Sequence, residues 1–281
     1  MINDITFGQF IDTNSKIHKL DPRTKLLLLI ALIVIVFISN NFLSLGLTVV
    51  FSIVAILMTK IPLSMYLKNI KSILPIIIIT SLLNVFYADG GKVLFDWWIF
   101  TITSAGVSRS VFMTLRIVLL ILVSAVLSYT TSPTSLTGAI ESLLKPLKLV
   151  GLSNAVHTMA MVMTIALRFI PTLIEETQKI MNAQKARGAD LESGSIVKRV
   201  KALLPILIPL LISSIRRAYE LAEAMECRCY NGGIGRTKYR IMKYSYRDII
   251  AAVVSAFILA GVIVLNIYSG VIYSLIYSLV F

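Results

Sequence analysis

The sequence predicts an all-α integral membrane protein with about five transmembrane helices and a basic helical region that carries two long amphipathic arms. Two properties of the 281 residues point to this fold class. The mean hydropathy is +0.86 and 57% of the residues are hydrophobic, which exceeds the apolar share of a typical water-soluble domain. Charged residues are also segregated, so that long uncharged runs alternate with segments rich in Lys and Arg.

The uncharged runs predict where the chain crosses the bilayer, since one crossing needs about 20 predominantly apolar residues. No charge occurs from Leu26 to Thr59, which is too long for one span, and Asn40 and Asn41 divide this run into two. Five spans are therefore expected, at residues 26–39, 42–59, about 72–88, about 111–129 and within 249–281.

The same pattern predicts four parts of the chain: residues 1–25, residues 26–130 with four transmembrane helices, residues 131–247, and residues 248–281 with the last span. Residues 131–247 hold 17 of the 27 Lys and Arg residues. Apolar pieces at 152–167 and 203–215 are short and are broken or flanked by polar residues or proline. They either span when tilted or lie along the inner leaflet, and the second alternative is preferred.

Basic residues predict the orientation, because cytosolic loops of membrane proteins carry an excess of Lys and Arg. A cytosolic N-terminus in the plasma membrane, with residues 131–247 also cytosolic, places 24 of the 27 basic residues inside. The other three are Lys92, Arg109 and Arg116. Arg116 falls within the fourth expected span, so it should face protein or water and have a partner.

Two similar arms lie within 131–247. The first runs from Arg168 to Ala186-Arg187-Gly188, with Pro171 at a helix start or a kink, and the second runs from about Pro209 to Cys227-Arg228-Cys229. Each predicts an amphipathic helix of about five turns, or roughly 27 Å. The expected apolar stripes are Ile170, Leu173, Ile174, Thr177, Ile180 and Met181 in the first arm, and Ile215, Ala218, Tyr219, Ala222 and Met225 in the second.

Each arm ends in an arginine between small residues, and the two arginines are 41 residues apart. One alternative is that they complement the helix dipole, as basic residues at helix C-termini often do. The duplication favours a partner with two matched pockets, such as a dimer, in which each guanidinium pairs bidentately with a carboxylate.

Other motifs predict no catalytic or metal site. The glycine-rich run 232–238 lacks the Gly-Lys-Ser/Thr order of a phosphate-binding loop, and two cysteines alone form neither a disulfide framework nor a zinc site. His18 and His157 have no Ser, Cys or carboxylate at a spacing typical of catalysis. The basic run 236–247 is expected to meet acidic lipid head groups.

Several motifs, in the same order and over nearly the whole chain, resemble the transmembrane (T) components of energy-coupling factor transporters, the EcfT/CbiQ-like family. They are Ser15–Lys25 (SKIHKLDPRTK), Thr130–Thr134, Leu167–Thr172, Ala183–Asp190 and Arg216–Glu226. In that family the T component joins two ABC-type ATPases to a separate membrane subunit, the S component, which binds the substrate.

The resemblance implies that residues 131–247 form a coupling domain and that ATP and Mg are bound by the partner ATPases, with no cofactor on this chain. It implies docking into the two ATPases by Ala186, Arg187 and Gly188 and by Cys227, Arg228 and Cys229. The second motif is Cys-Arg-Cys where the family often has Ala-Arg-Gly, so the second helix stop is expected at Gly232. The apolar surface of this domain is expected to contact the S component or lipid, with the S component at Leu203, Leu207 and Leu211.

The predicted function is therefore the coupling subunit of an importer for vitamins or other micronutrients, such as transition-metal ions. The chain itself is predicted not to be an enzyme, and its partners are a homo- or heterodimer of ATPases, an S component and the lipid bilayer, without nucleic acid. Two alternatives are a self-sufficient secondary transporter, which favours internal span repeats, and a membrane enzyme, which needs a cytosolic cluster of acids, histidines or metal ligands.

Overall fold

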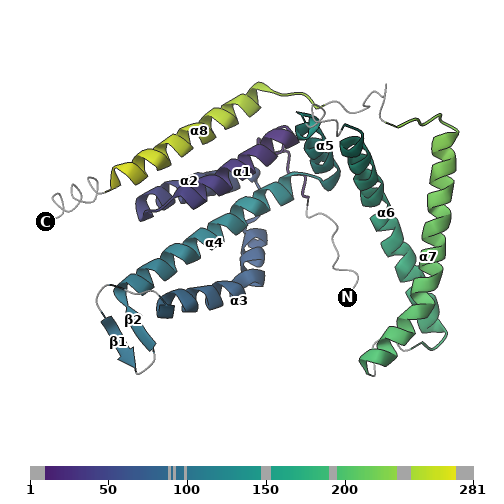
Figure 1. Ribbon diagram of the computed structural model, residues 1–281, viewed down its shortest axis with the longest axis horizontal. Helices are drawn as coiled ribbons and strands as arrows, with labels where there is room; N and C mark the ends of the chain where they lie inside the picture. The colour runs from purple at the N-terminus through teal and green to yellow at the C-terminus, as the bar shows by residue number, and fades with distance from the viewer. Residues whose placement is uncertain are drawn as a thin grey trace. The chain divides into compact units, whose positions relative to one another are not determined.

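The computed structural model describes residues 10–87, 90, 93–97, 100–146, 153–189, 195–232 and 242–269. Within them the chain forms eight α-helices and one antiparallel hairpin (Figure 1). The elements are α1 (Pro22–Ile38), α2 (Phe42–Thr59), α3 (Leu63–Tyr87), β1 (Val93–Trp97), β2 (Phe100–Thr103), α4 (Ser104–Thr130), α5 (Pro133–Leu143), α6 (Ser153–Ala186), α7 (Ile196–Glu226) and α8 (Tyr246–Ile267). The all-α membrane fold class is confirmed.

The chain folds as two units. The membrane unit comprises residues 8–132 and 242–281 and contains α1 to α4, the hairpin and α8. The arm unit comprises residues 133–241, together with 1–7, and contains α5 to α7.

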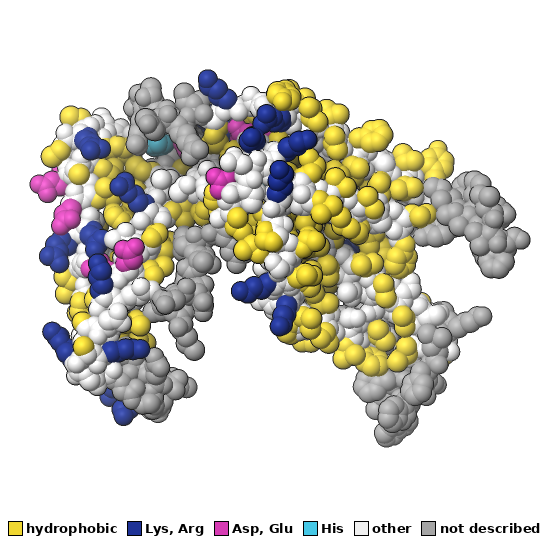
Figure 2. Space-filling model, turned by 180° about the vertical axis from the view of Figure 1, so that it is seen from behind, with side chains coloured by type: hydrophobic (Ala, Val, Ile, Leu, Met, Phe, Trp, Pro, Cys, Tyr) yellow, Lys and Arg dark blue, Asp and Glu magenta, His cyan; other side chains and the backbone are white. Residues whose placement is uncertain are grey.

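The described helices include six that are long and apolar enough to cross a bilayer: α2, α3, α4, α6, α7 and α8. The chain is therefore a multi-pass membrane protein. The visible face of the membrane unit is mainly hydrophobic, and Lys and Arg side chains gather along one edge of it (Figure 2). Whether α6 and α7 cross the bilayer or lie in its inner leaflet stays a prediction.

Element boundaries differ from the expected spans in a consistent direction. Residues 42–59 coincide with α2, whereas α3 and α4 begin at Leu63 and Ser104, earlier than the expected 72 and 111. Both extensions include basic residues, which mark the end of an apolar run but do not end a helix. The loop expected between these spans contains the hairpin, in which Val93 pairs with Thr103 and Trp97 with Phe100.

Two small apolar clusters hold the membrane unit together. One joins α1, α2 and α4 through Val36, Leu45, Leu119 and Val123. The other joins α2, α3 and α4 through Ile56, Ile61, Tyr66, Ala125 and Tyr129.

Arg116 of α4 has the partner that its position in a span requires. Its Nη2 donates to the Ser39 carbonyl at the C-terminal end of α1, and its guanidinium lies 4.8 Å from the centre of the Phe112 ring. A helix end leaves carbonyl groups without intrahelical partners. The cation is thus paired with the negative end of the α1 dipole.

The N-terminal motif 15–25 joins helix ends within the membrane unit. The preceding residues Ile11 and Thr13 add contacts of the same kind. Ile11 N donates a hydrogen bond to the Tyr129 carbonyl of α4 at 3.0 Å. Hydrogen bonds reach the ends of α2 and α4 and the start of α8: Thr13 Oγ1 to the Thr59 carbonyl (2.6 Å), Lys25 Nζ to the Thr130 carbonyl (2.8 Å) and Asp21 N to the Asp248 carboxylate (2.8 Å). The motif therefore fixes four helices relative to one another.

Asp248 joins the start of α8 to the N-terminal segment, and its replacement by alanine tests this role. The buried carboxylate accepts from Asp21 N at 2.8 Å and from Ser245 N at 2.7 Å. A hydrogen bond to a charged group contributes about 1.5–3 kcal/mol, so we expect Asp248→Ala to lower the free energy of unfolding by about 3 kcal/mol. Denaturant unfolding of the full chain in detergent, followed by helical circular dichroism, measures this change.

Asp12→Ala is the matched control, because Asp12 is an exposed acid of the same unit with one contact to the Asn14 backbone. Its loss should change the free energy of unfolding by less than about 0.5 kcal/mol. Equal unfolding midpoints for the two variants would contradict the role assigned to Asp248.

Candidate functional site

The two arms are continuous with the apolar pieces that precede them. α6 has 34 residues and α7 has 31, which correspond to about 51 Å and 47 Å. Pro171 lies inside α6, and Pro205 and Pro209 lie inside α7. The expected start of the second arm near Pro209 is therefore wrong, and Pro171, expected at a helix start or a kink, is not a helix start. Each proline removes one N–H donor, but an unbroken helix satisfies all the other backbone groups, which an apolar environment requires.

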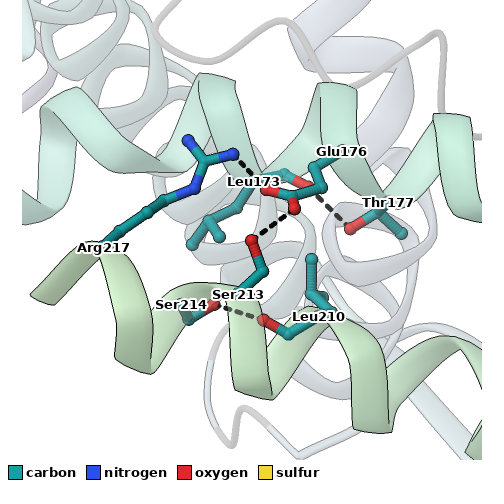
Figure 3. Close-up of polar contacts among 7 residues, drawn as sticks. All are labelled: Leu173, Glu176, Thr177, Leu210, Ser213, Ser214 and Arg217. Carbon is teal, nitrogen blue, oxygen red and sulfur yellow. Dashed lines mark hydrogen bonds and ion pairs between the residues drawn. The ribbon is translucent and has the colours of Figure 1, made fainter.

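α6 and α7 pack against each other and cross, with their C-terminal ends on opposite sides of the crossing (Figure 1). At the crossing, Glu176 of α6 contacts two side chains of α7 (Figure 3). Its carboxylate accepts from Arg217 Nη2 at 2.5 Å and from the Ser213 hydroxyl. The Arg217 and Glu176 side chains are 34% and 21% exposed, so solvent screening limits the pair to about 1 kcal/mol or less. Its effect is mainly to set the register of the crossing.

The two arginine tips lie at equal distances along their helices from the crossing. Arg187 follows Glu176 by 11 residues, and Arg228 follows Arg217 by the same number, so each tip lies about 16 Å along its helix from the crossing. Glu176 and Arg217 are also 41 residues apart, like the two arginines. Residues at equivalent positions of the two arms therefore contact each other, as a twofold relation between the arms requires.

The first tip has a glycine-terminated helix end. Arg187 N donates to the Ala183 and Gln184 carbonyls, and Ala189 N donates back to Gln184 O at 3.0 Å. Gly188 adopts the left-handed region with φ +83°, where glycine has no Cβ penalty. The expected stop at Gly188 is confirmed, and Arg187 is exposed at the turn.

The second tip has the same geometry without the glycine. Tyr230 N donates back to Met225 O at 3.0 Å, and Cys229 adopts the left-handed region with φ +54°. α7 ends at Glu226, so the helix stop expected at Gly232 is wrong. The backbone bond that closes the turn places Cys229 where the first tip has Gly188, and Arg228 is exposed one residue before it, as Arg187 is.

The left-handed conformations of Gly188 and Cys229 predict that a substitution at each position changes the stability of its tip in the opposite direction. Gly188→Ala should weaken the first tip by about 1 kcal/mol, because a Cβ is unfavourable in the left-handed region. Cys229→Gly should strengthen the second tip by about the same amount, for the same reason. Hydrogen exchange of the full chain measures this as an approximately fivefold change in amide protection at each tip.

Cys227→Gly is the control, because Cys227 has an ordinary helical conformation with φ −57°. There glycine should reduce protection by adding freedom to the unfolded chain. If Cys227→Gly and Cys229→Gly change protection in the same direction, the left-handed turn is not the cause.

Leu203, Leu207 and Leu211 lie at four-residue spacing on one face of α7, and they are 41%, 54% and 62% exposed. Much of α7 around them is also apolar and exposed: Val197, Val200, Leu204, Ile208, Ile212 and Ile215. The arm unit thus leaves more apolar surface uncovered on this helix than scattered surface residues would.

The expected stripe of the second arm is the less buried side of α7. Tyr219 is 73% exposed and Ile215 is 49% exposed, while Arg217 and Leu221 are partly buried. The contacts of Ser213 and Arg217 with Glu176 turn this other side toward α6. In α6, by contrast, the expected stripe from Ile170 to Met181 is partly buried throughout.

Both histidines have partners that sequence spacing did not reveal. His18 Nδ1 lies 2.7 Å from the buried Ser15 hydroxyl, and His18 Nε2 lies 2.6 Å from the Ile11 carbonyl. His157 Nδ1 lies 3.6 Å from Glu141 of α5. These contacts tie the N-terminal segment to itself and α5 to α6. No group of three or more His, Cys, Asp or Glu side chains able to hold a metal ion occurs among the residues described.

Comparison with known proteins agrees with a multi-pass membrane protein. Residues 13–239 match the family model CbiQ, described as cobalt transport protein. The chain is 50% identical over 254 residues to the energy-coupling factor transporter transmembrane protein EcfT of Acidaminococcus fermentans, covering 90% of this chain and 94% of that protein. It is 43% identical over 266 residues to EcfT 1 of Listeria monocytogenes, with 95% and 99% covered.

The chain therefore belongs to the EcfT/CbiQ family of transporter transmembrane proteins.

Proposed function

We propose that this chain is the coupling subunit of an ATP-driven importer of the energy-coupling factor type. Its arm unit carries motion from a dimer of ABC-type ATPases to a separate substrate-binding membrane subunit. The ATPases bind ATP and Mg, and this chain has no catalytic site of its own. The imported substrate is a micronutrient, such as a vitamin or a transition-metal ion.

The observation that carries this proposal is the equality of the two arms. Each exposed arginine lies about 16 Å from the crossing, one residue before a left-handed turn residue, Gly188 or Cys229. A dimer offers the same pocket twice, related by a twofold axis. Two equal arms that cross at equivalent residues match such a partner, whereas a role in capping the helix ends gives no reason for equal length.

Transmission of motion requires arms that do not bend freely and contacts that differ between states. The Glu176–Arg217 ion pair and the Ser213 hydrogen bond hold the two helices in register at the crossing. Displacement of one tip by an ATPase therefore moves the other helix as well. The exposed apolar face around Leu207 is the surface through which we propose that this motion reaches the substrate-binding subunit.

Co-purification tests the proposed function directly. When the full chain carries an affinity tag, ATPase subunits and a small membrane subunit should purify with it, and proteoliposomes of the whole complex should import substrate only with ATP. If the purified chain alone bound and transported the substrate, it would be a self-sufficient transporter instead.

The proposed orientation places the N-terminus and residues 131–247 in the cytosol. In a variant whose Cys227 and Cys229 are replaced by serine, a single cysteine at Lys185 should resist a membrane-impermeant maleimide added to intact cells. A cysteine at Val93, which is 59% exposed in the hairpin, should react. Efficient external labelling at position 185 would reverse the topology.

A further inference from the structure

A groove of about 920 Å³ runs along the membrane unit between α1, α2, α4 and α8. This volume lies within the range of about 300–1,000 Å³ that is usual for ligand sites. One face of α2 and one face of α8 form two of its walls. Their lining residues repeat with the same helical spacing: Leu47, Val50, Phe51, Val54, Ala55 and Met58 in α2, and Arg247, Ile250, Ala251, Val254, Ser255 and Ile258 in α8.

These walls are mainly apolar, and several of their side chains are exposed. Val50 is 61% exposed, Val54 48%, Ile250 56% and Val254 43%. From residue 47 to 58 and from 247 to 258 each wall extends over about 17 Å. The hydrocarbon of one leaflet is about 15 Å thick, half of the 30 Å core, so the groove has the length of a single leaflet.

The two ends of the groove differ. At the far end α2 and α8 come together, since a methyl group at Gly261 would lie 3.3 Å from Leu47 Cδ2. Asn266 Nδ2 of α8 also donates to the Ile38 carbonyl of α1 at 2.6 Å. At the near end, where α1 and α8 begin, the exposed cations Lys16, Lys19 and Arg247 line the groove.

We propose that the groove binds an anionic glycerophospholipid, with its phosphate at Lys16, Lys19 and Arg247 and its acyl chains along α2 and α8. Three exposed cations at one end and mainly apolar walls of one-leaflet length match a lipid in both charge and size. A transmembrane helix of a partner protein would extend over about 30 Å, well beyond the closed end of the groove. Basic residues at a membrane surface attract anionic lipids in general, and the groove adds a defined place for the chains.

Native mass spectrometry of the full-length chain in detergent tests this proposal, with phosphatidylglycerol and phosphatidylcholine as probes. The unchanged chain should prefer phosphatidylglycerol. The triple variant Lys16→Gln, Lys19→Gln and Arg247→Gln should bind it at least about tenfold more weakly, because each surface cation contributes about fivefold. Ala251→Phe, which places a larger side chain in the groove and so narrows it, should reduce binding of both lipids.

The matched control is the triple variant Lys60→Gln, Lys68→Gln and Lys71→Gln. It removes the same charge from exposed positions of the same unit, outside the groove, and should keep lipid binding within about twofold of the unchanged chain. Equal losses in the two triple variants, or equal binding of both lipids by the unchanged chain, would overturn the proposal. All six residues are exposed, so the charge variants test binding rather than folding.

The alternative to a lipid is that a helix of a partner membrane subunit occupies the groove. Crosslinking distinguishes the two occupants. A cysteine at Val54, in a chain without Cys227 and Cys229, should react in the assembled complex with a maleimide-bearing lipid. Its crosslinking to the partner subunit instead would show that the groove holds protein.

Discussion

The double variant Arg187→Ala, Arg228→Ala is expected to lose both ATPase association and substrate uptake, and each single variant to weaken both. If each tip enters an ATPase groove, the guanidinium makes charge-assisted contacts from which water is partly excluded. Removing one member of such a pair typically costs about 2–5 kcal/mol, because the facing carboxylate is left unpaired. Pull-down of the ATPases by the tagged chain and an uptake assay measure the two losses.

Lysine at either position should restore these activities only in part, since an ammonium group lacks the planar fork that pairs bidentately with a carboxylate. Arg216→Ala is the control, because Arg216 is exposed on α7 but lies outside the tip. Its removal should change association by less than about 1 kcal/mol.

The alternative is that both arginines complement the helix dipoles. It predicts a loss of only about 0.3–1 kcal/mol in local helix stability, with assembly intact. Normal ATPase association and uptake in the double variant would thus remove the docking role and leave only the capping one.

Leu207→Asp is expected to release the substrate-binding subunit while both ATPases stay bound. Leu207 is 54% exposed on the apolar face of α7, so the substitution leaves the packing of the arm unit largely unchanged. In a complex it would place an unpaired carboxylate in an apolar interface, which costs several kcal/mol. Quantitative co-purification of the two kinds of partner measures both outcomes in one experiment.

Lys198→Asp serves as the control for Leu207→Asp. It adds an acid at an exposed position in the first turn of α7, where a negative charge is compatible with the helix dipole. Both classes of partner should remain bound. If Leu207→Asp kept the substrate-binding subunit, or lost the ATPases with it, the apolar face of α7 would not be the surface that grips that subunit.

Much of the local structure followed from the sequence. Residues 42–59 were expected as a span and form α2, and the first arm was expected to end at Gly188, where the left-handed turn lies. Both features depend on neighbouring residues alone: hydropathy over about five turns for the span, and the conformational freedom of glycine for the turn. The arginines at both tips also follow from neighbouring residues, since each lies between small residues at the end of an amphipathic segment.

The sequence also contains a signal for the crossing. Applying the 41-residue offset of the two arginines to Glu176 leads to Arg217, a residue of opposite charge. An offset alone does not say that equivalent residues touch, because two similar helices pack in several ways. The ion pair establishes that they do.

Long apolar helices and two arms ending in arginine follow from the amino-acid sequence, because hydropathy and helix-end preferences act over a few turns. Contacts between residues far apart in the chain become visible only in the folded protein. Asp248 contacts Asp21 across 227 residues, and the crossing turns the apolar side of α7 outward. In both cases contacts between segments far apart in the chain select among arrangements that local preferences leave nearly equal in energy.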